Sequence, residues 1–283
     1  MANPWMERRV LCHAHQGGAR EGPSSTLWAL EHAVQAGADA LELDVHATLD
    51  GHLVVCHDPT VDRTTPASGA IATMTLAELR TLDNAYWWVP GSVVDHDRGV
   101  GDYPLRGRAP SDATLGIATL EEVLDRFEGT FLNLDIKQTA PAVPPYEEAL
   151  AAALRRRGRT GDVIVASFND ASTVAFRTFA PGIGTSAGIL AVADFWRAAH
   201  AGGPLPELPH VALQVPVQTA GVTVLDEVLI DAAHHAGLAV HAWTIDDLDE
   251  MNRLIGLGVD AIMSDVPTVL VSALGDAGVR YRR

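Results

Sequence analysis

The chain has 283 residues, of which 47% are hydrophobic and 20% are charged, so it has enough apolar surface to bury one large core. This composition excludes a disordered or fibrous protein. The 20 basic and 36 acidic residues give a net charge of −16, which argues against broad contact with the phosphates of nucleic acid or with an anionic membrane surface. An anionic substrate would therefore have to be bound locally, by a metal ion or a few placed donors.

The cysteines and the N-terminal residues bear on the compartment. Cys12 and Cys56 are too few for a disulfide framework and lie in short apolar runs, so we expect both to be reduced core residues. Residues 1–9 contain no apolar leader segment, and no run approaches the roughly 18 apolar residues of a membrane span. We expect a soluble cytoplasmic protein without stable membrane insertion, unless a signal peptide has been removed.

The chain alternates between short apolar runs and amphipathic stretches. Nine runs predict buried strands, because each is brief, rich in Val, Ile and Leu, and bounded by Gly, Asp or Pro: Val10–Ala14, Ala40–Val45, Leu53–His57, Phe131–Ile136, Val163–Phe168, Ile183–Ile189, Val211–Val215, Leu238–Thr244 and Val259–Met263. Seven stretches predict helices: Ser25–Ala36, Thr75–Leu82, Thr119–Arg126, Tyr146–Arg157, Asn169–Phe179, Val224–Ala236 and Ile245–Leu257. This alternation predicts an α/β fold, a closed (β/α)8 barrel of the TIM type.

Two regions depart from that rhythm. A barrel needs eight strands, and the link Ala47–His52 is too short for a helical crossover, so we expect a hairpin or a helix-free connection within residues 40–57. Residues 84–117 contain five glycines, three prolines and several aromatic residues, without clear periodicity. We expect a single barrel domain over residues 1–283, with 84–117 as an insertion packed near the barrel mouth.

Ionisable residues stand at the ends of the early predicted strands. They are His15, Glu42, Asp44, His57, Asp135 and Lys137. Active sites of barrel enzymes gather at the C-terminal strand ends, so these groups should meet at one mouth. Glu42 and Asp44 are two residues apart and therefore share a strand face, as do Asp135 and Lys137. Carboxylates in a barrel interior repel one another unless a cation joins them, so Glu42, Asp44 and Asp135 predict a site for Mg²⁺ or Ca²⁺.

Each of these residues also has an ordinary structural explanation. An E-x-D pair in a strand can lie on a solvated face or form salt bridges. His57 before Asp58-Pro59 can cap a turn, and His13 and His15 can be polar residues at a strand end. Their coincidence at successive strand ends favours a catalytic site.

An ordered series of motifs carries a family resemblance. The early motifs are His15–Gly18, Pro23–Thr26, Ala38–Val45, Thr48–Gly51, Val54–Pro59 and Asp62–Thr65, and the later ones are Thr119–Leu124, Asn133–Lys137, Ala242–Ile245 and Ile262–Pro267. In this order and spacing, the sequence resembles the glycerophosphodiester phosphodiesterase family from about residue 10 to 270.

The resemblance implies a metal-dependent barrel enzyme that hydrolyses glycerophosphodiesters to sn-glycerol 3-phosphate and an alcohol. It implies that His15 and His57 are the acid/base pair and that Glu42, Asp44 and Asp135 bind one divalent cation, Mg²⁺ or Ca²⁺. Further matching positions imply that Lys137 contacts the phosphate and that Trp243 forms a wall of the glycerol pocket. The nucleophile can be the neighbouring glycerol hydroxyl, which gives a cyclic phosphate, or water.

Three positions depart from the family pattern. Gln16 stands where the family has a phosphate-clamping arginine, so a neutral amide replaces a bidentate charged contact. Ser24 replaces a glutamate, and Asp135 stands where the family usually has Glu. The nearby Arg20 and Glu21 could supply substitute groups.

Two other functions use the same residues differently. Related barrels act as lysophospholipase D or sphingomyelinase D, and Trp87 and Trp88 could form an apolar lip for an acyl chain, unless they cover the insertion's own core. The second alternative is a non-catalytic binding module, in which the substitutions at Gln16 and Ser24 mark a site that has lost its catalytic activity.

Overall fold

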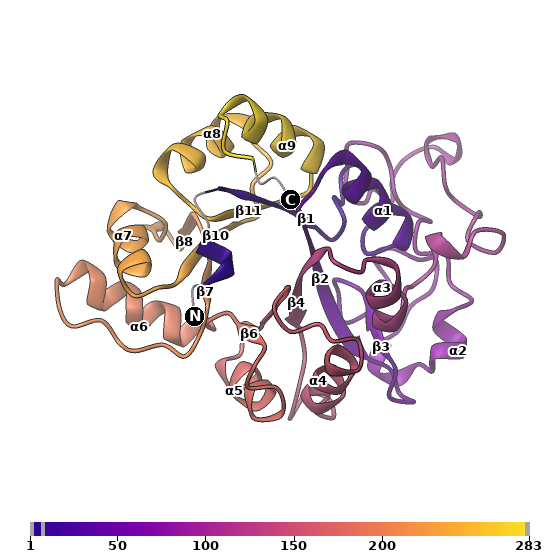
Figure 1. Ribbon diagram of the computed structural model, residues 1–283. Helices are drawn as coiled ribbons and strands as arrows, with labels where there is room; N and C mark the ends of the chain where they lie inside the picture. Colours follow the sequence, from indigo (N-terminus) through magenta and orange to yellow (C-terminus); the bar gives the residue numbers. More distant parts are fainter. Residues whose placement is uncertain (1–2, 7–8, 281–283) are drawn as a thin grey trace.

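Eight parallel strands form a ring in the computed structural model, which describes residues 3–6 and 9–280 (Figure 1). Part of the N-terminal stretch without an apolar leader lies outside the described residues. The strands are β1 (Leu11–His15), β2 (Ala40–Ala47), β4 (Phe131–Ile136), β5 (Val163–Ala166), β6 (Gly184–Thr185), β7 (Ala212–Pro216), β10 (Ala239–Trp243) and β11 (Ala261–Ser264). Their order is β6-β5-β4-β2-β1-β11-β10-β7, and a parallel bridge between Ser186 and Ala212 joins the two ends. The predicted TIM-type barrel is confirmed.

Helices surround this ring on its outer side (Figure 1). They are α1 (Leu27–Ala36), α3 (Leu120–Arg126), α4 (Glu147–Arg156), α5 (Asp170–Phe179), α6 (Ile189–His200), α7 (Glu227–His235), α8 (Leu248–Leu257) and α9 (Pro267–Asp276). Short helical turns lie outside the repeating units: η1 (Pro4–Met6), η2 (Ile71–Thr73), α2 (Leu76–Leu79), η3 (Val100–Asp102) and η4 (Ala113–Leu115). Within the described residues, none of the helices is long and apolar enough to cross a bilayer.

Local capping explains several helix ends. Thr119 and Glu122 form a capping box at the start of α3, in which each side chain accepts from the other residue's backbone. Gly37 and Gly258 follow α1 and α8 in the left-handed conformation, at φ 100° and 94°, which a glycine adopts without a steric penalty.

The structure corrects the prediction in the region 183–200. The expected strand Ile183–Ile189 shrinks to β6, and its last residue opens α6. Helix α6 was missed because it begins with a continuous apolar run, which periodicity cannot distinguish from a buried strand. Helix α9 was also missed, although Pro267 stands at its start, where proline is favourable.

Two hairpins lie outside the parallel barrel. Strand β3 (Leu53–Val55) pairs antiparallel with β2, with Val45 opposite Val55, so the expected helix-free connection is confirmed. An unpredicted second hairpin joins β8 (Gln218–Thr219) to β9 (Val222–Thr223).

The segment 84–117 packs on the loop that follows β1. Trp88 is buried with Leu115 and against Trp28, and its Nε1 donates to the carbonyl of Ala19 at 3.2 Å. Trp87 donates to the carbonyl of Thr65 at 2.8 Å. Trp88 thus covers a core of the segment itself, and the indole of Trp87 packs on His96 and Tyr103 of the same segment, which favours the alternative to an apolar lip.

The barrel interior becomes more polar along its axis. At the N-terminal strand ends, Trp5 packs with Leu11, Ile164 and several alanines. His13 and His241 follow, both fully buried with ring centroids 5.1 Å apart. Residues between these inward-facing positions, such as Cys12 and Leu41, point outward into the main core beneath the helices. Like Cys12, Cys56 is buried and unpaired, as expected.

The buried His13 generates a prediction about acid stability. Neither ring nitrogen has a hydrogen-bond partner, and burial lowers the pKa of His13 to about 3. Between pH 6.5 and 3 the unfolded chain therefore binds more protons at this residue, and stability falls as the pH falls. We expect His13→Leu to reduce this slope by up to about 1.4 kcal/mol per pH unit, measured by urea unfolding at pH 7, 5.5 and 4.5. The exposed substitution His235→Asn is the control, and parallel slopes for His13→Leu and the parent would contradict the prediction.

Candidate active site

One cavity of about 270 Å³ opens at the C-terminal ends of the barrel strands. Its lining brings together seven of the eight site residues expected from sequence: His15, Glu42, Asp44, His57, Asp135, Lys137 and Trp243. The eighth, Gln16, is buried and does not line it. This is the position at which barrel enzymes hold their active sites.

Strand pairing places the carboxylates together. Strand β2 lies beside β4 with Asp44 opposite Asp135 and Glu42 opposite Asn133, so the acidic side chains face one interior. Lys137 follows directly after β4, and its Nζ lies 3.0 Å from Asp44 Oδ1 and 3.6 Å from Asp135 Oδ2. The shared ammonium group neutralises part of this acidic cluster.

Lys137 is the only lysine in the sequence, which contains nineteen arginines. Burial would lower its pKa, but the charges of Asp44 and Asp135 outweigh burial and raise it. A compact ammonium can reach two carboxylates from one point, whereas a planar guanidinium needs a wider site. The geometry thus accounts for lysine at this one position.

Burial governs the protonation of the carboxylates. It raises the pKa values of Glu42 and Asp135, and together with the charge of Glu42 it raises that of Asp44 to about 7. Asp44 Oδ2 and Asp135 Oδ1 are buried without a hydrogen-bond partner. Buried polar oxygens are normally paired, so these two need a further cationic or donor group.

The donor chemistry of this cluster fits a hard divalent cation. Mg²⁺ and Ca²⁺ prefer carboxylate oxygens, and the unpartnered oxygens of Asp44 and Asp135 provide them beside Glu42. In the described part of the chain, no three His, Cys, Asp or Glu side chains already stand in a metal-binding arrangement. The residues are thus suited to such an ion, and their side chains would have to adjust to bind it.

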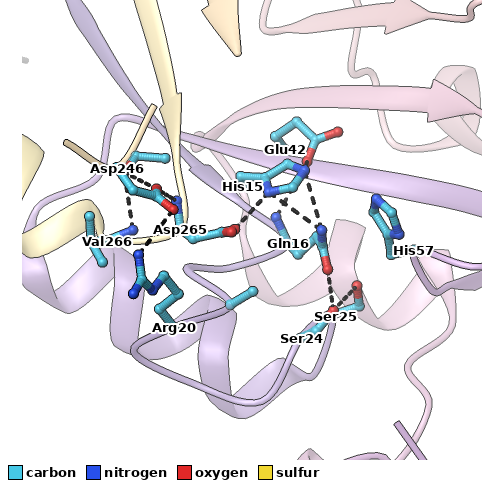
Figure 2. A network of polar contacts seen from close by, with 12 residues as sticks. His15, Gln16, Arg20, Ser24, Ser25, Glu42, His57, Asp246, Asp265 and Val266 are labelled. Carbon is cyan, nitrogen blue, oxygen red and sulfur yellow. Dashed lines mark hydrogen bonds and ion pairs between the residues drawn. The ribbon is translucent and has the colours of Figure 1, made fainter. Parts of the chain in front are cut away.

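His15 is oriented by a residue that the sequence analysis missed. At the end of β1, its Nδ1 lies 2.7 Å from Asp265 Oδ1, and its Nε2 lies 3.8 Å from Glu42 Oε2 (Figure 2). Burial would lower the pKa of His15, but Glu42 and Asp265 outweigh it and raise the pKa to about 9. The available signal was the position of Asp265, which directly follows β11 in the block Ile262–Pro267.

A second layer holds Asp265 in place. Asp246 Oδ1 accepts from the backbone N–H of Asp265 at 2.8 Å and from Ser264 Oγ at 3.1 Å, and Arg20 Nη1 lies 3.6 Å from Asp246 Oδ2 (Figure 2). Glu21 accepts from Thr268. Arg20 and Glu21, considered above as substitutes for the charged groups missing at positions 16 and 24, are therefore paired elsewhere and do not line the cavity.

The departures at positions 16 and 24 contact each other. Ser24 Oγ donates to Gln16 Oε1 at 2.5 Å, and both side chains are buried (Figure 2). The backbone N–H of Gln16 donates to the carbonyl of Glu42 at 3.0 Å, and its Nε2 lies 3.3 Å from His15 Nε2. A neutral hydrogen-bonded pair thus lies beside His15, where the resemblance implies two charged residues.

His57 follows β3 and has its own acidic partner. Its Nδ1 lies 2.6 Å from Asp58 Oδ1, and Arg63 Nε donates to Asp58 Oδ2 at 2.5 Å. Burial would raise the pKa of Asp58, but these hydrogen bonds outweigh it and lower the pKa to about 2. The His15 and His57 rings meet edge to face with centroids 5.8 Å apart. Two imidazoles, each on a carboxylate, therefore border one cavity.

Paired histidines, buried carboxylates and one lysine at a barrel mouth have the chemistry suited to an enzyme that acts on charged esters. A sequence model of the glycerophosphoryl diester phosphodiesterase family matches residues 15–269. A glycerophosphodiester phosphodiesterase of Caldanaerobacter subterraneus subsp. tengcongensis is 30% identical in an alignment of 275 residues that covers 95% of this chain and 100% of that protein. The chain belongs to the glycerophosphoryl diester phosphodiesterase family and is an enzyme, so the non-catalytic reading is set aside.

Solved structures agree with this assignment. A Silicibacter pomeroyi protein superposes with a TM-score of 0.75 at 26% identity, covering 99% of this chain and 97% of its own. An Oleispira antarctica phosphodiesterase, solved in complex with the product sn-glycerol-3-phosphate, gives a TM-score of 0.70 at 26% identity, covering 94% and 97%. The family resemblance and the barrel are therefore confirmed.

The position of Lys137 between Asp44 and Asp135 generates a prediction about stability. Raised carboxyl pKa values mean that the native state binds more protons than the unfolded chain above about pH 4, so stability falls as the pH rises. Without Lys137 these pKa values rise further. We expect Lys137→Met to destabilise the protein by about 3–5 kcal/mol at pH 8 and by clearly less at pH 5, measured by urea unfolding. Arg253→Met, which breaks an exposed ion pair with Glu250, should cost less than about 1 kcal/mol at either pH. A pH-independent loss would contradict the prediction.

Proposed function

We propose that this enzyme hydrolyses glycerophosphodiesters to sn-glycerol 3-phosphate and an alcohol, with His15 and His57 as the acid and the base. The observation that carries the proposal is the convergence of two carboxylate-bound imidazoles and the only lysine on one cavity. Phosphodiester cleavage needs proton transfers to and from oxygen and compensation of the phosphate charge, and these groups provide both. The glycerol-3-phosphate bound to the Oleispira antarctica relative supports the substrate class.

The two histidines differ in their surroundings, and this assigns their roles. His15 is held in its charged form by Glu42 and Asp265, so its Nε2–H is the proton donor to the leaving alkoxide. His57 takes the proton from the nucleophile, which is either the adjacent glycerol hydroxyl or water, and Asp58 orients its ring. The carboxylates at both Nδ1 atoms fix which nitrogen faces the cavity.

The remaining residues bind and position the substrate. Lys137 contacts the phosphate, and the half-buried Trp243 presents its face to the glycerol carbons. Gln16, expected to bind the substrate, does not line the cavity, and its side-chain oxygen accepts from Ser24 on the loop that follows β1. Asn84 of the 84–117 segment donates to the carbonyl of Ser24 at 3.1 Å, which favours one domain with this segment as a brace at the mouth.

A divalent cation, Mg²⁺ or Ca²⁺, completes the proposed site. Glu42, Asp44 and Asp135 would hold it, and the bound ion would offset the negative charge of the phosphate. Removal of divalent ions by a chelator should abolish turnover, and adding back Mg²⁺ or Ca²⁺ should restore it.

Replacement of either histidine tests the proton transfers. We expect His15→Ala and His57→Ala each to lower kcat for glycerophosphocholine by about 10²–10⁴-fold with a much smaller change in KM, because binding groups stay in place. The control is His52→Ala, at an exposed position away from the cavity lining. A kcat within a few-fold of the parent would show that the substituted histidine has a structural role.

Asp265 is a positioning residue, and its test separates orientation from folding. We expect Asp265→Asn to lower kcat by roughly 10–100-fold and to shift the pH profile, since loss of the carboxylate lowers the pKa of His15. Asp249→Asn makes the same charge change at an exposed residue of α8 and should leave the pH profile unchanged. If both variants keep the parent pH profile, Asp265 does not orient His15.

A further inference from the structure

A second, larger cavity of about 450 Å³ lies beside the active-site cavity. The start of α6 and the β8–β9 hairpin supply residues on its walls, including Ile189, Val192 and Val222. The two cavities share four lining residues: Phe168, Ala187, Gln214 and Trp243. The two cavities are therefore adjoining spaces.

The lining of this cavity is apolar although it is open to solvent. Phe168, Ile189 and Val222 are 55%, 58% and 45% exposed, an unusual exposure for large apolar side chains that lie together. Among its described lining residues, Arg197 is the only charged one, and it is paired with Asp194. An exposed apolar hollow next to a catalytic centre indicates a binding site for an apolar group.

Internal contacts of the protein hold the walls of this cavity in place. Both carboxylate oxygens of Asp170 accept from the first turn of α6, from Leu190 N–H at 3.0 Å and Ala191 N–H at 3.1 Å. Phe195 anchors the same helix in the main core. The opposite wall is a hydrogen-bonded hairpin. A preformed pocket loses little conformational entropy on binding, which favours affinity.

We propose that this cavity binds a single aliphatic chain carried by the phosphodiester substrate, an inference that rests on the proposed function. The path from phosphate to chain is short: Lys137 Nζ lies 5.7 Å from the Phe168 ring centroid, and that ring lies 5.5 Å from Trp243. A diester whose phosphate is at Lys137 can pass its chain over Phe168 toward Ile189. The chain can be an acyl group on the glycerol or part of the leaving alcohol, and the pocket chemistry is the same for both.

A chain-length series tests this proposal. The substrates are glycerophosphocholine, 1-acyl-lysophosphatidylcholines with four to eight acyl carbons, and glycerophospho-N-acylethanolamines of the same lengths, all kept below micelle-forming concentrations. A fully buried methylene contributes about fourfold to binding, so we expect kcat/KM to rise about two- to fourfold per methylene in at least one series. The responding series identifies which side of the phosphate carries the chain.

Two neighbouring residues supply a matched pair of variants. Ile189→Asn places an amide in the cavity, and we expect it to remove most of the gain per methylene. Leu190→Asn makes nearly the same change one residue later, at a side chain that is 70% exposed and does not line the cavity, and should leave the gain intact. Val222→Asn on the hairpin should have the same effect as Ile189→Asn. Because Val222 lies outside α6, this second variant separates loss of the binding site from misfolding of α6.

A binding measurement separates this proposal from the proposed function. Octylphosphocholine should bind with a negative heat-capacity change by calorimetry, and Ile189→Asn should weaken it about tenfold relative to Leu190→Asn. If glycerophosphocholine is hydrolysed but neither series shows a gain, or the gain survives Ile189→Asn, the chain site is wrong and the hydrolase stands. If octylphosphocholine binds in this way but no glycerophosphodiester is hydrolysed, the chain site stands and the proposed function fails.

Discussion

Closure of eight parallel strands forces every second residue of each strand into one shared interior, and the chemistry of this protein depends on that constraint. The interior runs from the apolar layer around Trp5, through His13 and His241, to the carboxylates of Glu42 and Asp135. Carboxylates buried in this way resist ionisation unless cations compensate them. The only lysine of the sequence, Lys137, lies beside Asp44 and Asp135, and His15 lies beside Glu42, so cationic groups compensate the buried carboxylates.

The two histidines reach the cavity from different structural layers. His15 belongs to the barrel itself, whereas His57 is delivered by β3, an antiparallel strand attached to the outside of β2. Each histidine has a carboxylate on its Nδ1, but Asp265 comes from the far end of the chain and Asp58 from the next residue. The barrel strand β1 thus positions His15, and the antiparallel strand β3 beside the barrel positions His57.

Sequence reasoning reached the barrel and the groups on its strands because both follow from local periodicity. Period-two spacing put Glu42 and Asp44 on one face, and strand ends put the ionisable residues at one mouth. Groups on loops were less predictable, because loop side chains point where tertiary contacts direct them. Arg20 therefore turned to Asp246, and Trp88 into the core of its own segment.

The sequence also did not predict the start of α6 or the contact between His15 and Asp265, because both depend on tertiary packing. The apolar start of α6 reads equally well as strand or helix, and only its packing beside Asp170 decides. Asp265 had a visible signal in its place after a strand, but its partner His15 lies 250 residues earlier in the sequence. A single sequence does not show which of its distant residues meet.

The neighbouring strands β1 and β11 give the site a dependence on complete folding. Leu11 pairs with Ala261, and Ala14 with Ser264, so this seam of the barrel joins segments about as far apart in the chain as the fold allows. Closing such a long loop carries a large entropic cost and comes late in assembly when nearer contacts form first. His15 and Asp265 stand at the upper end of this seam. Their hydrogen bond can form only once β1 and β11 have paired, so a chain in which this seam is open would leave His15 without the carboxylate that orients its ring.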